Sequence, residues 1–389
     1  MSIIALAIPA FFVLIFVEAV VAWLRHRHVY RFNDAVTDIS CGIGNQIIGK
    51  VLLGTALGAV YIGVYTRFHL FELEALHPIL LWAFGLLAYD LIYYWWHRMS
   101  HEVNVLWAAH IVHHHSEDYN LAVALRQAWF TPITSLPFYL TLALIGVPPH
   151  VYFLCGAIDT LYQFWIHTQL IDRVGPLEAV LNTPSHHRVH HGVNDEYLDR
   201  NYAGIFIFWD RLFGSFEPER AEPVYGTTKP LASFSPVWAN LHHLRDIARR
   251  SREMTRWGDK LRVWFGHPGW HPGGVHRGLV GDELRERKQH KYDADRSGPW
   301  VKAYIVLHFI AVTYAVVMLL NYYKQLSVGV LLAASALVIT TTAVWGGLFE
   351  GRRWAWPLEI VRLAGAAALL YYLFYVVGAE RLTTLLAAS

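Results

Sequence analysis

Six long apolar stretches constrain the fold of this 389-residue chain more than any other feature of its sequence. They cover residues 3–24, 39–65, 79–96, 301–322, 326–349 and 354–377. A helix needs about 20 apolar residues to cross the hydrocarbon core of a bilayer, where every backbone polar group must find its partner within the protein. The sequence therefore predicts an all-α, polytopic integral membrane protein with about six full transmembrane helices.

Two shorter apolar stretches, residues 132–147 and 151–167, are separated by Pro148 and Pro149. Each has about 16 residues, which is short for a full crossing at about 1.5 Å per residue. We expect residues 132–167 to form a short helical hairpin whose two ends return to the same side of the membrane.

Basic residues indicate the orientation of the chain. A cluster from Arg25 to His28 follows the first apolar stretch, and Arg352 and Arg353 separate the last two. The positive-inside rule places these turns in the cytoplasm. The chain then divides into N-terminal transmembrane helices (1–96), a catalytic region with histidine motifs (97–219), a cytoplasmic surface segment (220–300) and C-terminal transmembrane helices (301–389). The formal net charge of +2 indicates no nucleic-acid partner.

Eight histidines form three clusters with the spacings HxxxH, HxxHH and HxxHH. The clusters contain His97 and His101; His110, His113 and His114; and His187, His190 and His191. Positions i, i+3 and i+4 share one face of a helix, so each cluster can present two or three imidazoles together. Imidazole binds zinc, copper, nickel and iron. One such pair could be chance, but three matched clusters favour a metal site.

Eight imidazoles exceed the ligands that one ion uses, so we expect two metal ions in a helical cap on the cytoplasmic side. His167 ends the predicted hairpin and brings a ninth imidazole to the same level. Carboxylates are sparse near the clusters. The nearest are Glu102, Glu117, Asp118, Asp195 and Glu196. Glu102, adjacent to His101, is the first candidate for a bridging role or for orienting a ligand.

Other histidines are predicted to be non-ligands. His267, His271 and His276 lie in a loop rich in glycine and proline, and their spacings match no helix face. His242 and His243 receive the same interpretation.

The position of the clusters indicates a lipid substrate. Ligands at the ends of membrane helices can reach a lipid whose body stays in the bilayer, and a histidine-rich pair of metals with open positions suits iron and O2. Two other classes stay open. A zinc-dependent membrane hydrolase is expected to carry HExxH, which none of the clusters contains. A haem-binding electron carrier needs histidines that face each other across spans.

Residues 97–126, 162–171, 175–194 and 201–219 resemble the fatty acid hydroxylase/sterol desaturase superfamily of membrane di-iron enzymes, particularly its branch that cleaves ether lipids. The strings TPSHHRVHHG and WDRLFGSFEPE carry much of the likeness. The resemblance implies that a hydroxyl is placed on the alkyl carbon beside the ether oxygen, giving a fatty aldehyde and a glycerol derivative. Other members of the superfamily hydroxylate or desaturate fatty acyl chains, carotenoids and sterols, so these substrates remain the alternative.

The resemblance also implies a site and its cofactors. It assigns two irons to His97, His101, His110, His113, His114, His187, His190 and His191, with His167 as a further ligand. Glu102 matches a glutamate tied to activity or to pterin use, and His186 lies one residue outside the HxxHH frame, where it would support the ligands. His115 is a neighbour of the second cluster, not a ligand. The reductant would be tetrahydrobiopterin or another reduced pterin, or otherwise an electron-transfer protein.

Overall fold

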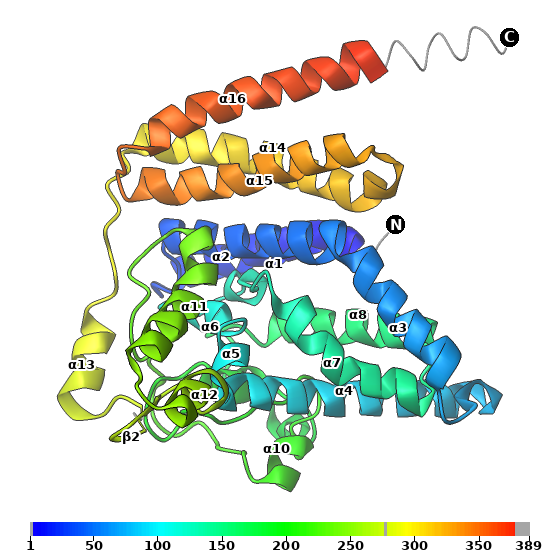
Figure 1. Ribbon diagram of the computed structural model, residues 1–389. Coiled ribbons are helices and arrows are strands. Elements are labelled where there is room, and N and C mark those ends of the chain that lie inside the picture. Colours follow the sequence, from blue (N-terminus) through cyan, green and yellow to red (C-terminus); the bar gives the residue numbers. More distant parts are fainter. Residues whose placement is uncertain (1–2, 276–277, 378–389) are drawn as a thin grey trace, which may run out of the picture.

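The computed structural model describes residues 3–275 and 278–377, and these residues are mostly helical (Figure 1). The longer helices are α1 (Ile3–Leu24), α2 (Phe32–Asn45), α3 (Gly54–Phe68), α4 (Pro78–Glu102), α7 (Thr131–Ile145), α8 (Pro149–Trp165), α11 (Pro236–Glu253), α14 (Pro299–Tyr322), α15 (Val328–Phe349) and α16 (Ala355–Tyr371). The shorter ones are α5 (Asn104–Trp107), α6 (Ile111–His114), α9 (Pro184–His190), α10 (Phe208–Phe213), α12 (Trp257–Phe265) and α13 (Gly281–Gln289). Two two-residue strands, β1 (Trp270–His271) and β2 (Gly274–Val275), pair antiparallel.

Five of the described helices are long and apolar enough to cross a membrane: α1, α4, α14, α15 and α16. A sixth span results if α2 and α3 count as one. Apolar side chains such as Leu307 and Val361 are about two-thirds exposed along these helices, which suits contact with lipid tails. These helices show that the protein is an integral membrane protein with several spans.

The apolar stretch 39–65 forms a bent helix. The helix begins at Phe32, continues through a π-helical segment (Gln46–Leu52) and turns by 54° into α3. A π-helical insertion disturbs the regular hydrogen-bond ladder and is a recognised cause of sharp bends. The apolar composition of this stretch predicted a long helix but not the bend.

Two glycines in α2 allow the chain that follows the second histidine cluster to approach closely. A Cβ on Gly42 would lie 2.2 Å from the carbonyl oxygen of Leu125, and one on Gly44 would lie 2.0 Å from the indole nitrogen of Trp129. Any larger residue would push this segment away. The close contact positions residues 125–129 directly behind the cluster.

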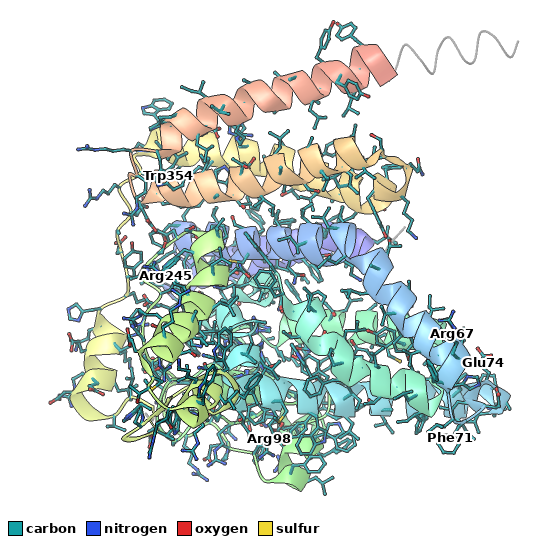
Figure 2. All side chains as sticks on the ribbon, in the orientation of Figure 1. Arg67, Phe71, Glu74, Arg98, Arg245 and Trp354 are labelled. Atoms are coloured by element: carbon teal, nitrogen blue, oxygen red, sulfur yellow. The ribbon has the colours of Figure 1, made fainter. Side chains whose placement is uncertain are left out.

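The long helices stack in layers whose axes run in broadly the same direction (Figure 1). The order is α16, then α14 with α15, then α1 with α2, then α7 with α8, and finally α4. The segments α5, α6 and α11–α13 gather at one end of this stack. Figure 2 shows Arg98 and Arg245 at that end, and Arg67 and Glu74 at the other. Polar groups therefore lie at the ends of an apolar stack, with the histidine clusters at one end.

The helices α7 and α8 form the expected hairpin. Gly146 ends α7 with a left-handed backbone (φ 106°), and Pro149 starts α8. The carbonyl of Val147, in the connecting turn, accepts a hydrogen bond from the Tyr61 hydroxyl at 2.9 Å. His167 follows the last turn of α8, so the hairpin returns the chain to the end of the stack where the other histidines lie.

Candidate metal centre

Four segments bring the histidines together. The last turns of α4 carry His97 and His101, and α9 carries His187 and His190, with His191 as its C-terminal cap. The second cluster lies on α6 and the residue before it, and His167 follows α8. Proline at the first position of α4 and of α9 suits a helix start, because proline has no N–H to leave unpaired. All nine side chains are buried, with at most 6% exposed.

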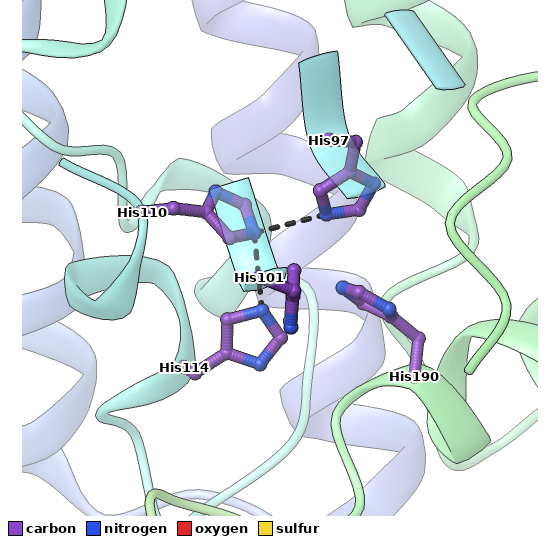
Figure 3. A group of neighbouring side chains, drawn as sticks. All are labelled: His97, His101, His110, His114 and His190. Atoms are coloured by element: carbon purple, nitrogen blue, oxygen red, sulfur yellow. Dashed lines mark hydrogen bonds between the residues drawn. The ribbon is translucent and has the colours of Figure 1, made fainter. Parts of the chain in front are cut away.

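The nine imidazoles form two groups. Group one contains His97, His101, His110, His114 and His190 (Figure 3). Group two contains His113, His167, His187 and His191. Within each group, the nitrogens that could bind a metal all lie within 4.8 Å of one another. These nine residues are the ones that sequence pattern and resemblance predicted to be ligands.

Each cluster presents two imidazoles together, as expected, but the remaining histidine of each HxxHH cluster belongs to the other group. In the second cluster His110 and His114 belong to group one, while His113 belongs to group two. In the third cluster the i and i+4 residues, His187 and His191, belong to group two, and His190 belongs to group one. Each HxxHH cluster therefore contributes to both groups, whereas His97 and His101 of the first cluster both belong to group one. The two groups are held together by the short helices that they share.

Backbone carbonyls fix the tautomer of four of these histidines. The Nδ1 atoms of His97, His113, His167 and His190 lie 2.7–3.0 Å from the carbonyl oxygens of Tyr202, Arg126, Gln163 and Arg200. A carbonyl oxygen can only accept, so each Nδ1 carries the hydrogen and each Nε2 of a neutral ring keeps a lone pair. Two residues of each group thus offer a bare Nε2.

The bare nitrogens approach each other closely. Nε2 of His113 and Nε2 of His167 are 3.2 Å apart, although neither neutral ring has a hydrogen there to share. In group one, His97 Nε2 is 2.9 Å from Nε2 of His110, and Nε2 of His101 and of His190 has no hydrogen-bond partner. Lone pairs converging in a buried space repel unless a cation lies among them. Both groups therefore fit a metal ion that prefers imidazole, such as iron or zinc.

Burial keeps the rings of the second histidine cluster neutral. It lowers the pKa of His113 to about 4, although the hydrogen bond to the Arg126 carbonyl acts in the opposite direction. Burial, and then the neighbouring imidazoles, also hold the pKa of His110 and His114 well below the usual value. A neutral imidazole is the form that binds metals.

Asp199 is a functional candidate that sequence reasoning missed. Its carboxylate lies 3.5 Å from Nδ1 of His101 and 3.1 Å from Nε2 of His267. Burial alone would raise the pKa of Asp199, but its hydrogen bonds with His101 and His267 hold the pKa below its usual range. A carboxylate behind a ligand imidazole fixes the orientation of the ring. Asp199 has a left-handed backbone (φ 59°), and no motif spacing marks it.

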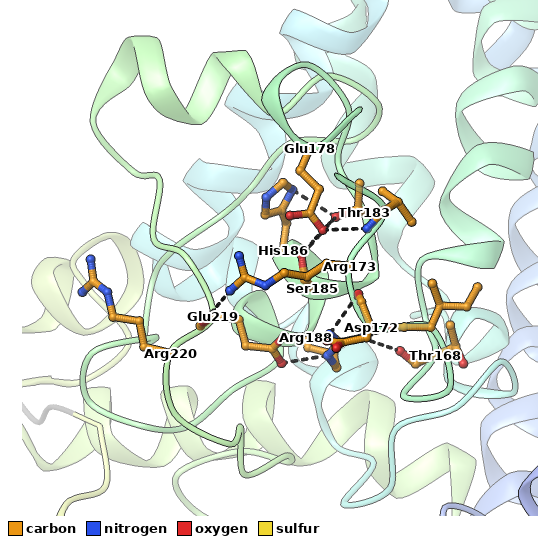
Figure 4. Close-up of polar contacts among 12 residues, drawn as sticks. Thr168, Asp172, Arg173, Glu178, Thr183, Ser185, His186, Arg188, Glu219 and Arg220 are labelled. Atoms are coloured by element: carbon orange, nitrogen blue, oxygen red, sulfur yellow. Dashed lines mark hydrogen bonds and ion pairs between the residues drawn. The ribbon is translucent and has the colours of Figure 1, made fainter. Parts of the chain in front are cut away.

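Two buried arginines hold the clusters in place, and neither was predicted. The guanidinium of Arg126 donates to the carbonyl of Val112 at 2.8 Å and to Asp38 at 2.7 Å, while its own carbonyl accepts from His113. Arg188, inside the third cluster, makes a two-pronged ion pair with Glu219 (Figure 4). These charge-assisted bonds fix the short helices that carry the imidazoles.

Glu102 lies outside both groups, where a bridging role is not possible. Its carboxylate accepts from Nε of Arg98 at 2.8 Å. It lines a polar cleft of about 380 Å³ together with Asp199, Tyr202 and His267. The cleft is separated from group one by the carboxylate of Asp199.

The imidazole of His186 also lies outside both groups (Figure 4). Its Nδ1 is 3.3 Å from the hydroxyl of Thr183, and its ring meets Phe216 edge-on. Neither contact involves one of the nine clustered histidines. The structure therefore does not place His186 where it would orient a ligand directly.

The histidines predicted to be non-ligands lie outside the two groups as well. His115 is buried, and its Nε2 is 3.0 Å from Nε2 of His242. His243 contacts Asn104, and His267 contacts Asp199. His271 is in β1, and His276 lies outside the described residues.

A mostly apolar cavity of about 1150 Å³ leads from the membrane helices to both groups. Its walls include apolar side chains of α1, α2, α7 and α14, for example Phe11, Ile43, Leu136 and Val316. His110 of group one and His113 and His167 of group two line it too. A long alkyl chain can therefore lie in the cavity with one carbon beside the imidazoles.

Fold and site together define a class of protein: a multi-pass membrane protein whose helices end at a buried double group of imidazoles. The fatty acid hydroxylase family model matches residues 82–215, the range that holds all nine. Alkylglycerol monooxygenase from Xenopus tropicalis is 37% identical over 352 residues, covering 90% of this chain and 78% of the relative. The same enzyme from Homo sapiens is 38% identical over 365 residues, covering 92% and 80%.

The chain therefore belongs to the alkylglycerol monooxygenase family, and it is a membrane-bound lipid monooxygenase. A more distant relative, ornithine lipid hydroxylase OlsE from Rhizobium tropici, is 30% identical over 145 residues, covering 34% of this chain and 40% of the relative. No solved structure matches. The resemblance drawn from the sequence motifs is confirmed.

Proposed function

We propose that this protein is a di-iron, O2-dependent monooxygenase that hydroxylates the alkyl carbon beside the ether oxygen of an alkylglycerol. The observation that carries the proposal is the apolar cavity that ends at imidazoles of both groups. The curated relatives of 37–38% identity are alkylglycerol monooxygenases, which supports this substrate over other lipids.

The proposed ligands of the first iron are the five imidazoles of group one, and those of the second are the four of group two. When bound, the irons would supply the reductive activation of O2. The protein's own contribution is to hold the ligand rings through backbone carbonyls and Asp199, and to keep water from the alkyl chain. The described groups contain no carboxylate, so ligand positions that the imidazoles leave free would be available to solvent, O2 or substrate.

The reaction balances without a second oxidant. One oxygen atom of O2 is inserted into the C–H bond, which becomes C–O–H. The other oxygen atom leaves as water, and the donor supplies the two electrons and two protons that this requires. The product is a hemiacetal, which collapses to a fatty aldehyde and a glycerol derivative. The cavity contributes by placing the ether end of the chain next to His110, His113 and His167.

The electron donor is proposed to be tetrahydrobiopterin or another reduced pterin, with an electron-transfer protein as the alternative. The proposed place for a small polar donor is the cleft lined by Glu102. This cleft adjoins group one, because Asp199 lines the cleft and also contacts His101. Glu102 would accept hydrogen bonds from the donor. The basic residues beside the membrane helices favour a centre on the cytoplasmic side.

The test uses purified protein with an alkylglycerol, a reduced pterin and O2, and measures fatty aldehyde. We expect aldehyde only when all three are present. Hydroxylated product from a free fatty acid or a sterol, with no aldehyde from the ether lipid, would assign another branch of the family. Turnover that continues without O2 would favour a zinc hydrolase.

A further inference from the structure

A buried carboxylate in the cavity wall is not explained by the metal groups. Asp159, on α8, lines the cavity and is only 2% exposed. Its Oδ2 accepts a hydrogen bond from Nε2 of Gln163 at 2.6 Å, but its Oδ1 has no hydrogen-bond partner. An unpaired buried carboxylate oxygen is costly, so such a group usually has a ligand.

Asp159 belongs to a polar strip that leads to the metal groups. Residues 159, 163 and 167 follow one face of α8 and its extension, and the carbonyl of Gln163 accepts from Nδ1 of His167. The Tyr93 hydroxyl of α4 donates to Oε1 of Gln163 at 2.7 Å. Tyr93 lies four residues before His97, and Gln163 lies four residues before His167. The hydrogen bond between Tyr93 and Gln163 is therefore about one helical turn away from the two histidines along α4 and α8.

The neighbouring carboxylate, Asp90 of α4, has all the donors it needs. It accepts from the backbone N–H groups of Ile205 and Phe206 and from the indole of Trp209. Gly204 lies between the two acids: a Cβ there would be 2.5 Å from Oδ1 of Asp159 and 2.7 Å from Oδ1 of Asp90. Asp159 therefore differs from Asp90 in keeping one oxygen free to accept a hydrogen bond from a hydroxyl donor.

We infer that Asp159, oriented by Gln163, is the subsite that binds a free hydroxyl of the lipid substrate and positions its neighbouring carbon at the metal groups. The inference rests on the proposed function and adds the residue that recognises the substrate, through a free hydroxyl a few bonds from the oxidised carbon. That spacing is found in an alkylglycerol, whose hydroxyls are separated from the ether carbon by the short glycerol backbone. Asp159 is therefore a positioning and specificity-determining residue.

The test is a binding measurement without reductant, so that it does not depend on turnover. Two lipids are compared on the metal-loaded protein: an alkylglycerol with both hydroxyls free, and the same lipid with both hydroxyls methylated. Leaving the buried carboxyl group without its hydrogen-bond partner is expected to cost the methylated lipid roughly tenfold to a hundredfold in affinity for the wild type. Asp159→Leu should bring the two affinities together, and Asp159→Asn, which keeps one acceptor, should give an intermediate ratio.

Thr160→Val is the matched control, because the Thr160 hydroxyl already donates to the carbonyl of Gly156. The ratio of its affinities for the free and the methylated lipid should equal that of the wild type. Equal binding of both lipids by the wild type, or an equal loss for both in Asp159→Leu, would overturn the inference and leave Asp159 a structural residue. A wild type that prefers the free hydroxyls but releases no aldehyde would support the subsite and reject the ether-cleavage reaction instead.

Discussion

At the scale of single residues, backbone carbonyls orient four of the nine clustered histidines. Four ligand rings donate Nδ1–H to carbonyl oxygens, and His101 alone faces a carboxylate, that of Asp199. Carbonyl partners leave the rings neutral and add no charge. The charge near group one is therefore concentrated at Asp199, which also faces the polar cleft.

Replacing Asp199 with Asn should weaken group one. The amide keeps the shape of the side chain but loses the negative charge that orients His101, so metal affinity or activity should fall roughly tenfold to a hundredfold. The measurement is iron retention against a chelator, together with kcat. His267→Gln removes the other partner of Asp199 and should have a smaller effect. Equal losses in the two variants would show that Asp199 does not act through His101.

Repeated spacing made eight of the ligand candidates predictable, and the predicted hairpin together with the family resemblance added His167. The residues that support them were not predictable. HxxHH is visible because two or three ligands share a short helix. The split of each HxxHH cluster between the two groups depends on how α6 and α9 face each other, which the sequence does not encode locally. Asp199 and Arg126 act through tertiary contacts, with Arg126 contributing its backbone carbonyl as well as its side chain. No residue pattern marks such roles.

At the scale of elements, the close contact between α2 and the segment after the second cluster supports the site. Length and hydropathy were enough to predict the long helices and the α7–α8 hairpin. The 54° bend between α2 and α3 was not predictable, because it depends on a π-helical segment inside an otherwise regular apolar stretch.

Gly42→Ala should destabilise the protein by about 1–3 kcal/mol, because its Cβ would lie 2.2 Å from the Leu125 carbonyl oxygen. The displaced segment carries Arg126, so metal content should fall too. Thermal unfolding in detergent and metal analysis measure both effects. Gly63→Ala is the matched control: nothing lies within 4 Å of a Cβ there, and alanine favours a helix more than glycine does. Two equally stable variants would contradict this packing role.

At the scale of the whole molecule, the polar segments gather at one end of the helix stack, and we propose from the positive-inside rule that this end faces the cytoplasm. A cysteine in place of Glu253, on α11, should therefore resist a membrane-impermeant maleimide in intact cells. A cysteine in place of Glu74, at the other end, should react. Both native cysteines, Cys41 and Cys155, are buried and should give little background. Labelling of a cysteine at position 253 in intact cells would show that the orientation is the opposite of the one proposed.

The central claim is that the nine imidazoles hold two ions in separate groups. Metal analysis of the purified protein tests it most directly. The account predicts two irons per chain in the wild type and about one in His113→Ala, because that substitution removes a ligand of group two and leaves the five of group one intact. A wild type with a single ion, or a His113→Ala variant that retains both, would contradict it.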